Sequence, residues 1–241
     1  ASVRPEIIDP KTTSVLLTST VKYDSKSTTK SSDTLKSEIT TAVTNYNTNT
    51  LQKFDSVYRH SKLTGIIDNV DTSILSNITT IKIRKNFTPT LSSSTKYDIY
   101  FRNSLFNPHS GHNKTAGGIL SSTGFKITDN DLEQFLDDDG NGNIRRYYLN
   151  GSTRVYVDNT AGTIIYSTGV VSINSLTYSS TSNTDSSIDF TMIPSSNDVI
   201  STKNQLLDIT ASQISVSGTA DTVASGETSA GVGYTTSSSY S

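Results

Sequence analysis

The 241-residue chain has no cysteine and no tryptophan, and its single methionine is Met192. The absence of cysteine excludes disulfide bonds and thiolate sites, whether catalytic or metal-binding. Sugar-binding sites usually stack the sugar on an exposed aromatic ring, so the lack of tryptophan weighs against a glycan-binding protein, although 12 tyrosines remain.

The chain also lacks an excess of either charge and any long apolar run. Its 20 basic and 22 acidic residues give a formal net charge of -2. We therefore expect no binding to nucleic acid and no electrostatic attraction to an anionic membrane. No apolar run approaches the roughly 18 residues of a membrane span. The first ten residues, ASVRPEIIDP, lack the apolar core of a signal peptide, so we expect a soluble protein.

Hydroxyl side chains are abundant, because the chain contains 40 serines and 37 threonines, about a third of its length. A composition rich in threonine and poor in lysine and glutamate favours β-structure. The sequence opens at Ala1 and not at a methionine, which predicts a processed product or the later part of a longer polypeptide.

Residues 1–92 are predicted to form a small α/β module in the order strand, helix, helix, strand. The first strand covers residues 12–24, and the last is the alternating run TTIKIRKNF at residues 79–87. The charges of its KIRK segment, residues 82–85, are expected on an exposed strand face, where they also hinder edge pairing. The segment FTPTLSSS at residues 87–94 indicates a hinge that closes the module.

Two amphipathic patterns predict the helices of this module. Ser32 or Asp33 is available as the N-cap of the first helix, and the second is expected to begin near Asp55. The apolar positions at helical spacing are Leu35, Ile39, Ala42, Val43 and Tyr46, followed by Leu63, Ile66, Ile67 and Val70.

Residues 93–217 are predicted to form an all-β domain of hairpins, because short strand-like runs alternate with polar turn clusters. NGS at residues 150–152 and NTAG at residues 159–162 contain the Asn and Gly that tight hairpin loops require. The exception is TDNDLEQFLDDD at residues 128–139, which predicts one short helix capped by Thr128 or Asp129. The fold class is therefore α+β.

Residues 218–241 have almost no bulky apolar side chains. This composition predicts an extended, low-complexity tail, and we expect a partner subunit to hold it.

The stretch FLDDDGNGNIRRYY, residues 135–148, resembles part of a calcium-binding EF-hand loop. Oxygen ligands would stand at positions 1, 3 and 5, with Gly142 at position 6, but Tyr148 replaces the glutamate that position 12 requires. The alternatives are an incomplete ion site and a polar turn with solvated, ionised carboxylates, and the missing glutamate favours the turn. The residues concerned are Asp137, Asp139 and Asn141, which we expect to hold the turn through side-chain to backbone hydrogen bonds.

No pattern predicts catalysis. No serine lies in a G-x-S-x-G motif. Of the three histidines, His60 stands alone, while His109 and His112 would supply only two ligands to a zinc ion. The pair Gly117 and Gly118 lacks the lysine and hydroxyl order of a phosphate-binding loop. We therefore expect no catalytic residue, no metal site and no cofactor.

Several segments resemble a known family. They are TSTVKYD, LKSEITTAVTNYN and, most specifically, YRHSKLTGIIDNVDTSILSNITTIKIRKNFTPTL at residues 58–91. Their order is similar to the C-terminal portion of baseplate J-like proteins, above all wedge subunit six of T-even-type contractile-tailed bacteriophages. Together with the β-rich segments FLDDDGNGNIRRYY and IPSSNDVISTKNQLLDI, the resemblance covers roughly residues 12–210.

This resemblance implies a structural role in the virion. Such a subunit pairs with copies of itself, as a dimer or ring, and with neighbouring wedge subunits of the tail baseplate, assembled in the host cytoplasm. It transmits rearrangement to the contracting sheath, and the family brings no catalytic residue and no small-molecule substrate. The alternatives are a glycan- or receptor-binding tail or adhesin module and, less favoured, a hydrolase.

Overall fold

A computed structural model describes residues 11–112, 119–202 and 205–222. The fold is mostly β with a small helical part, which agrees with the α+β class in its coarse form. The predictions for Gly117, Gly118 and the tail beyond residue 222 lie outside the described residues.

The chain first forms a helix-covered part of a sheet. Its elements are β1 (Lys11–Tyr23), α1 (Ser32–Tyr46), the π-helical turn η1 (Asn47–Leu51), β2 (Val57–Tyr58), α2 (His60–Asp68) and β3 (Ile74–Phe87). The N-cap of α1 is Ser31, one residue before the expected caps, and its Oγ accepts a hydrogen bond from the Thr34 amide at 3.1 Å. Helix α2 begins at His60, later than the expected Asp55, because the chain first forms β2.

Strand β1 is the centre of this part of the sheet. It pairs antiparallel with β3 on one edge. On the other edge it pairs in parallel with two strands from the end of the described chain, β13 (Gln205–Asp208) and β14 (Ile214–Ala220), which the 3-10 turn η2 (Ala211–Gln213) separates. The sequence groups both strands with the β-rich segment, whereas their pairing is with β1. The domain boundary between residues 92 and 93 stays a prediction.

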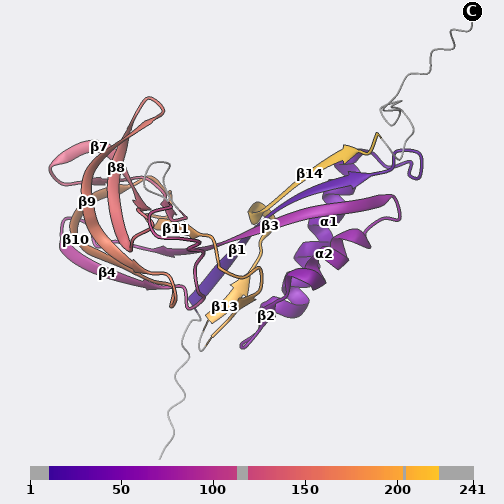
Figure 1. The fold of residues 1–241 in the computed structure, drawn as a ribbon, viewed down its shortest axis with the longest axis horizontal. Helices are drawn as coiled ribbons and strands as arrows, with labels where there is room; N and C mark the ends of the chain where they lie inside the picture. The colour runs from indigo at the N-terminus through magenta and orange to yellow at the C-terminus, as the bar shows by residue number, and fades with distance from the viewer. Residues whose placement is uncertain (1–10, 113–118, 203–204, 223–241) are drawn as a thin grey trace, which may run out of the picture.

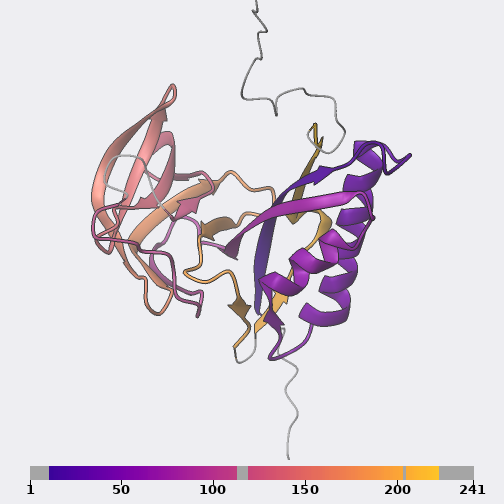
Figure 2. The same cartoon turned by 45° about the vertical axis from the view of Figure 1, so that its right-hand side comes forward.

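Helices α1 and α2 cover one face of this sheet (Figure 2). The helices bury Leu35, Ile39, Val43, Leu63 and Ile67, and the strands bury Val15, Leu17, Val21, Ile81 and Ile83. Most helical stability in proteins comes from such packing of an apolar face.

The β-rich region curls on itself at the other end of the molecule (Figure 1). Its strands are β4 (Ser94–Tyr100), β5 (Ser121–Ser122), β6 (Phe125–Ile127), β7 (Asn130–Asp138), β8 (Asn143–Asn150), β9 (Thr153–Ile165), β10 (Val170–Thr181) and β11 (Ile188–Met192), and β12 (Val199–Ile200) pairs with β2. The pairings β6–β7, β7–β8, β8–β9, β9–β10 and β10–β6 form a closed circuit. Closure leaves these strands few free edges.

Strand β3 connects the two regions, because it pairs with β1 along residues 74–84 and with β11 along residues 83–87. The KIRK segment lies where these pairings meet, with Ile83 and Arg84 paired on both sides, and Lys85 is only 7% exposed. The prediction of an exposed charged face is therefore wrong for Lys85, although Lys82 is exposed. In a strand, residues two apart share a face, and Lys85 follows Ile81 and Ile83 on the buried side.

The predicted helix at residues 128–139 is wrong, because residues 130–138 form β7. Leu132 is 49% exposed in this strand. The buried positions instead include Gln134 and Asp138, two residues either side of Leu136. Because polar residues occupy these buried positions, the segment does not show the alternation of apolar and polar residues that is typical of a strand.

Of the two predicted hairpin loops, one is confirmed. Asn150 pairs with Thr153 across the turn between β8 and β9, where Gly151 has a φ of 60°. The NTAG segment instead lies inside β9, at a register shift against β8. Its glycine, Gly162, permits close approach of β10, since a Cβ there would lie 2.3 Å from the Ser172 carbonyl oxygen.

Candidate functional site

The Asp137 carboxylate lies at the centre of a buried charge cluster in the β-rich region. Asp137 and Arg145 are opposite each other in the β7–β8 pairing, and the Arg145 Nε donates to Oδ1 at 2.9 Å. The other oxygen, Oδ2, accepts from Arg154 Nη1 at 2.6 Å and from the Tyr156 hydroxyl at 2.7 Å. The side chain of Asp137 is 1% exposed, so the expectation of a solvated carboxylate is wrong.

This cluster has the properties of a structural ion pair. Burial raises the pKa of the Asp137 carboxyl, while the hydrogen bond from Tyr156 and the charge of Arg145 oppose the rise. The guanidinium of Arg145 also lies over the Tyr156 ring, 4.3 Å from its centroid. Both carboxylate oxygens are therefore engaged by side chains of the protein itself.

The two aspartates that follow have separate partners. Asp138 is buried and accepts from the Leu120 amide at 2.8 Å and from the Tyr166 hydroxyl at 2.6 Å. Asp139 accepts from the Asn141 amide at 2.7 Å and from the amide and side-chain nitrogens of Asn143 at 3.0 and 2.7 Å. Burial raises the pKa of Asp139, but the hydrogen bonds from Asn143 and Asn141 outweigh it and lower the pKa.

Of the three residues that resemble calcium ligands, only Asp139 holds the turn in the expected way. Asp137 instead pairs with the arginines, and the Asn141 Oδ1 accepts from the Ser110 hydroxyl at 2.6 Å. The three side chains therefore serve three different sets of partners.

The ring nitrogens of the three histidines have their contacts with residues outside this turn. His112 Nδ1 lies 2.7 Å from the His109 carbonyl oxygen, and the two rings are 5.6 Å apart between centroids, in a loop. His60 begins α2, and its Nδ1 lies 3.3 Å from the Tyr58 hydroxyl. Among the residues that the structure describes, no three His, Asp or Glu side chains are grouped as metal ligands would be. That the protein uses no metal stays a prediction.

The most extensive candidate surface is the sheet face opposite α1 and α2, which we call the open face. It is formed by alternate residues of three adjacent strands, mostly hydroxyl-bearing: Leu16, Thr18, Thr20, Ile78, Thr80, Ser215 and Ser217. Ile78 is 70% exposed on this face, in the edge strand β3. We predicted β1 from its apolar and β-branched run. The alternation of exposed threonine with buried residues in this strand was a signal for an uncovered face, and we did not use it.

The edges of this sheet are also open. Within the described ranges, β14 pairs only with β1, and β3 has no partner along residues 74–82 on the edge away from β1. Unpaired strand edges offer amide and carbonyl groups to a strand of another chain.

Two of the three strands of the open face, β1 and β3, lie in a segment that matches a known family, together with the helices α1 and α2 behind them. Residues 13–86 match the family of baseplate structural protein gp6, C-terminal domain III. The predicted resemblance is confirmed over this segment, which we call the gp6-matched segment and which runs from β1 to β3. No curated protein matches the chain.

The match indicates a phage baseplate structural protein, and hence a component of the virion. The gp6-matched segment includes β1 and β3 of the open face but not β14, which lies beyond it in sequence. The resemblance of residues 87–210 stays a prediction. No helix in the described part of the chain is long and apolar enough to cross a membrane.

Proposed function

We propose that this chain is a wedge subunit of the inner ring of a contractile phage tail baseplate. It assembles with copies of itself and with neighbouring wedge proteins in the virion, and it has no enzymatic role. The observation that carries the proposal is the gp6-matched segment, whose sheet has an uncovered face.

The open face suits a contact between subunits. Specific interfaces between proteins bury at least about 1,000 Å² and combine a small apolar centre with a polar rim. Ile78 supplies an exposed apolar side chain, and Thr20 and Thr80 supply hydroxyl groups beside it. A second copy of this chain is the occupant that we propose for this face.

The continuity of β3 supports a role in transmitting rearrangement. This strand pairs with β1 at one end and with β11 at the other. A displacement of the β-rich region would therefore pull on the gp6-matched segment through one continuous strand, without a flexible linker at that point.

The test replaces Ile78 with aspartate and measures the assembly state by sedimentation velocity. We expect the unchanged chain to form a dimer or ring and Ile78→Asp to remain monomeric, because a carboxylate that becomes desolvated within an interface is costly. Ile165→Asp is the matched control, since Ile165 is a 52% exposed isoleucine in β9.

Ile165→Asp should keep the melting temperature of the unchanged chain, whereas Ile78→Asp should still unfold cooperatively but lose the stabilisation that comes from assembly. A chain that is monomeric at every concentration would contradict assembly with itself. Ile78→Asp assembling like Ile165→Asp would exclude the open face as the contact between copies.

A further inference from the structure

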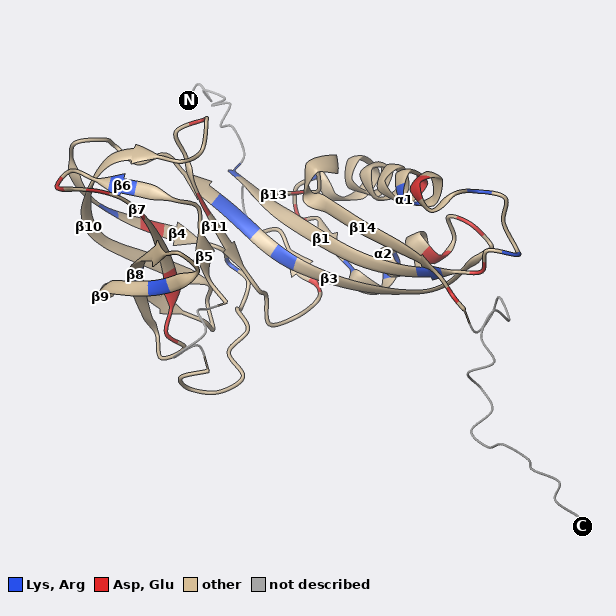
Figure 3. Ribbon diagram, turned by 90° about the horizontal axis from the view of Figure 1, so that it is seen from above, with Lys and Arg blue, Asp and Glu red and all other residues tan. Residues whose placement is uncertain are grey.

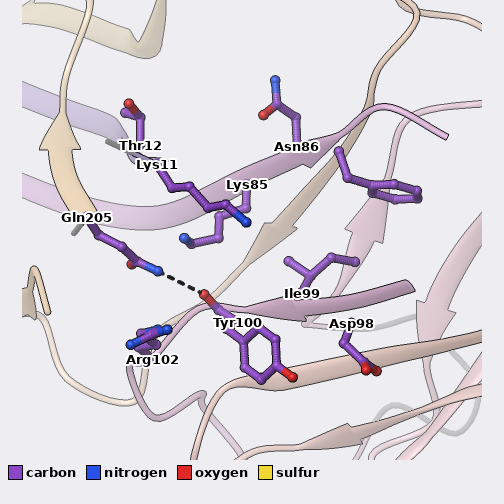
Figure 4. Close-up of a pocket in the computed structure, with 10 residues that line it drawn as sticks. Lys11, Thr12, Lys85, Asn86, Asp98, Ile99, Tyr100, Arg102 and Gln205 are labelled. Atoms are coloured by element: carbon purple, nitrogen blue, oxygen red, sulfur yellow. Dashed lines mark hydrogen bonds between the residues drawn. The ribbon is translucent and has the colours of Figure 1, made fainter. Parts of the chain in front are cut away.

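A cavity of about 330 Å³ lies where the two regions meet. Figure 4 shows the lining residues, which come from β1, β3, β4 and β13 and, for Arg102, from just after β4, with Lys11 and Lys85 side by side. Lys11, Lys85, Arg102 and Gln205 are among its lining residues, and Asp98 is the one carboxylate among them. The basic run of β3 that reaches this cavity is blue in Figure 3, beside β11.

Lys85 is the most buried cation of this cavity. The residue is 7% exposed, and in the described part of the chain it has neither an ion pair nor a hydrogen bond from its ammonium group. Burial lowers the pKa of Lys85 to about 8, and the charges of Arg102 and Lys11 add to this effect. The charged groups that shift the pKa of Lys85 are therefore of the same sign as its ammonium group.

Gln205, the most buried neutral polar residue of the cavity, already has hydrogen-bond partners in the protein. Gln205 is 6% exposed; its Oε1 accepts from the Thr13 hydroxyl at 3.3 Å, and its Nε2 donates to the Tyr100 carbonyl oxygen at 3.5 Å. Asp98 points away from the lysine ammonium groups in Figure 4 and forms no ion pair with them. No described side chain therefore neutralises Lys85.

Lys85 is largely buried, but its ammonium nitrogen is not among the fully buried unpaired atoms of the described residues, so this group is open to the cavity. A charge in such a partly desolvated position is unfavourable without a counter-ion, and proteins normally pair it. Three cations and one carboxylate line this cavity, so its walls favour a negatively charged occupant. The volume is at the small end of the range for ligand pockets, about 300 to 1,000 Å³. It admits a small anion or one acidic side chain.

We propose that this cavity binds an oxyanion, a phosphate or a carboxylate group, through Lys85, with Lys11 and Arg102 at its rim. Arginine can hold either group with two parallel hydrogen bonds. Arg102 also has a φ of 56°, a left-handed conformation that is uncommon for residues other than glycine and concentrates at binding sites.

The bound anion would join the two regions of the molecule. Lys11 and Lys85 come from the sheet of the gp6-matched segment, whereas Arg102 follows β4 of the β-rich region. An anion that contacts all three side chains fixes these elements relative to one another. This inference does not depend on the proposed baseplate role.

The test uses the full chain and two oxyanions, inorganic phosphate and acetate, each compared with chloride at constant ionic strength. We expect at least one of them to raise the melting temperature saturably, because a ligand that binds only the folded state stabilises it. Isothermal titration calorimetry then gives the dissociation constant. Lys85→Met should weaken binding at least tenfold, and Arg102→Gln, which leaves the buried lysine in place, should also weaken it.

Lys82→Met is the matched control, because Lys82 is an exposed lysine of the same strand. It should bind as the unchanged chain does. A response to phosphate alone assigns the site to a free phosphate group, and a response to acetate assigns it to an acidic side chain of a neighbouring subunit. The proposal is overturned if neither oxyanion differs from chloride, or if Lys85→Met binds as Lys82→Met does.

Discussion

Asp137 in the β-rich region and Lys85 at the junction with the helix-covered sheet are both buried charged residues, but their surroundings differ. Asp137 accepts hydrogen bonds from Arg145, Arg154 and Tyr156. Lys85 has the like charges of Arg102 and Lys11 acting on it and forms no ion pair with any described residue.

The difference follows from how each residue reaches the interior. The short turn between β7 and β8 places Arg145 directly opposite Asp137, so one hairpin supplies both charges. Lys85 becomes buried only when separate parts of the chain meet around β3. A charge neutralised within its own hairpin indicates a structural role, whereas a buried charge without a partner indicates a site for a ligand.

The largest expected effect comes from breaking the Asp137 cluster. Arg145→Met should lower the free energy of unfolding by about 3–5 kcal/mol, because it leaves a buried carboxylate with one guanidinium fewer. Denaturation by urea measures this loss. The control is Arg59→Met, whose partner Asp198 is also at the surface and whose side chain is 53% exposed; it should cost no more than about 1 kcal/mol. Equal losses in the two variants would remove the contrast between buried and exposed pairs.

A smaller effect of opposite sign is expected for Lys85→Met in chloride buffer. The pKa of Lys85 is lowered from 10.5 to about 8 in the folded protein, so between these pH values the unfolded chain binds the extra proton. The free energy of unfolding of the unchanged chain should therefore rise with pH from about 8 to 10.5, by up to about 3 kcal/mol at this group.

Lys85→Met should lack this rise and be more stable than the unchanged chain at pH 7. Urea denaturation across the pH range measures both quantities, and Lys82→Met should keep the slope. A Lys85→Met variant that is less stable at pH 7 would show that the ammonium group is neutralised in the folded protein.

No effect is expected from calcium. Asp139 already accepts three hydrogen bonds from Asn141 and Asn143, and Asp137 is held by two arginines. A calcium titration should leave the melting temperature unchanged. A saturable rise that Asp139→Asn removes would show that the turn rearranges to hold an ion, and would add a ligand site to the β-rich region.

Much of the local structure was predictable, because it depends on neighbours in sequence. The period of Leu35, Ile39 and Val43 indicated α1, and Asn150 with Gly151 indicated the β8–β9 turn. The predicted helix over β7 failed because Gln134 and Asp138 occupy inward positions that a strand pattern assigns to apolar residues.

The candidate sites were predictable only in part. Leu16, Thr18 and Thr20 marked one face of β1, but whether another layer covers that face depends on the placement of distant elements. Lys85 lies two positions after Ile83 and four after Ile81, so it shares their face of the strand, and this spacing was a signal for its burial. The pairing of Arg145 with Asp137 becomes predictable once residues 137–145 are assigned to a hairpin.

By itself the sequence determined the order of most strands and helices, the absence of thiol chemistry and the resemblance to a phage baseplate family. These properties follow from residue types and from spacings of a few positions. Tertiary structure alone decided that β13 and β14 pair with β1, that β3 runs through both regions and that Lys85 is enclosed by cations. Pairings of this kind join residues 197 positions apart, such as Leu17 and Ile214, and local propensities carry no information about them.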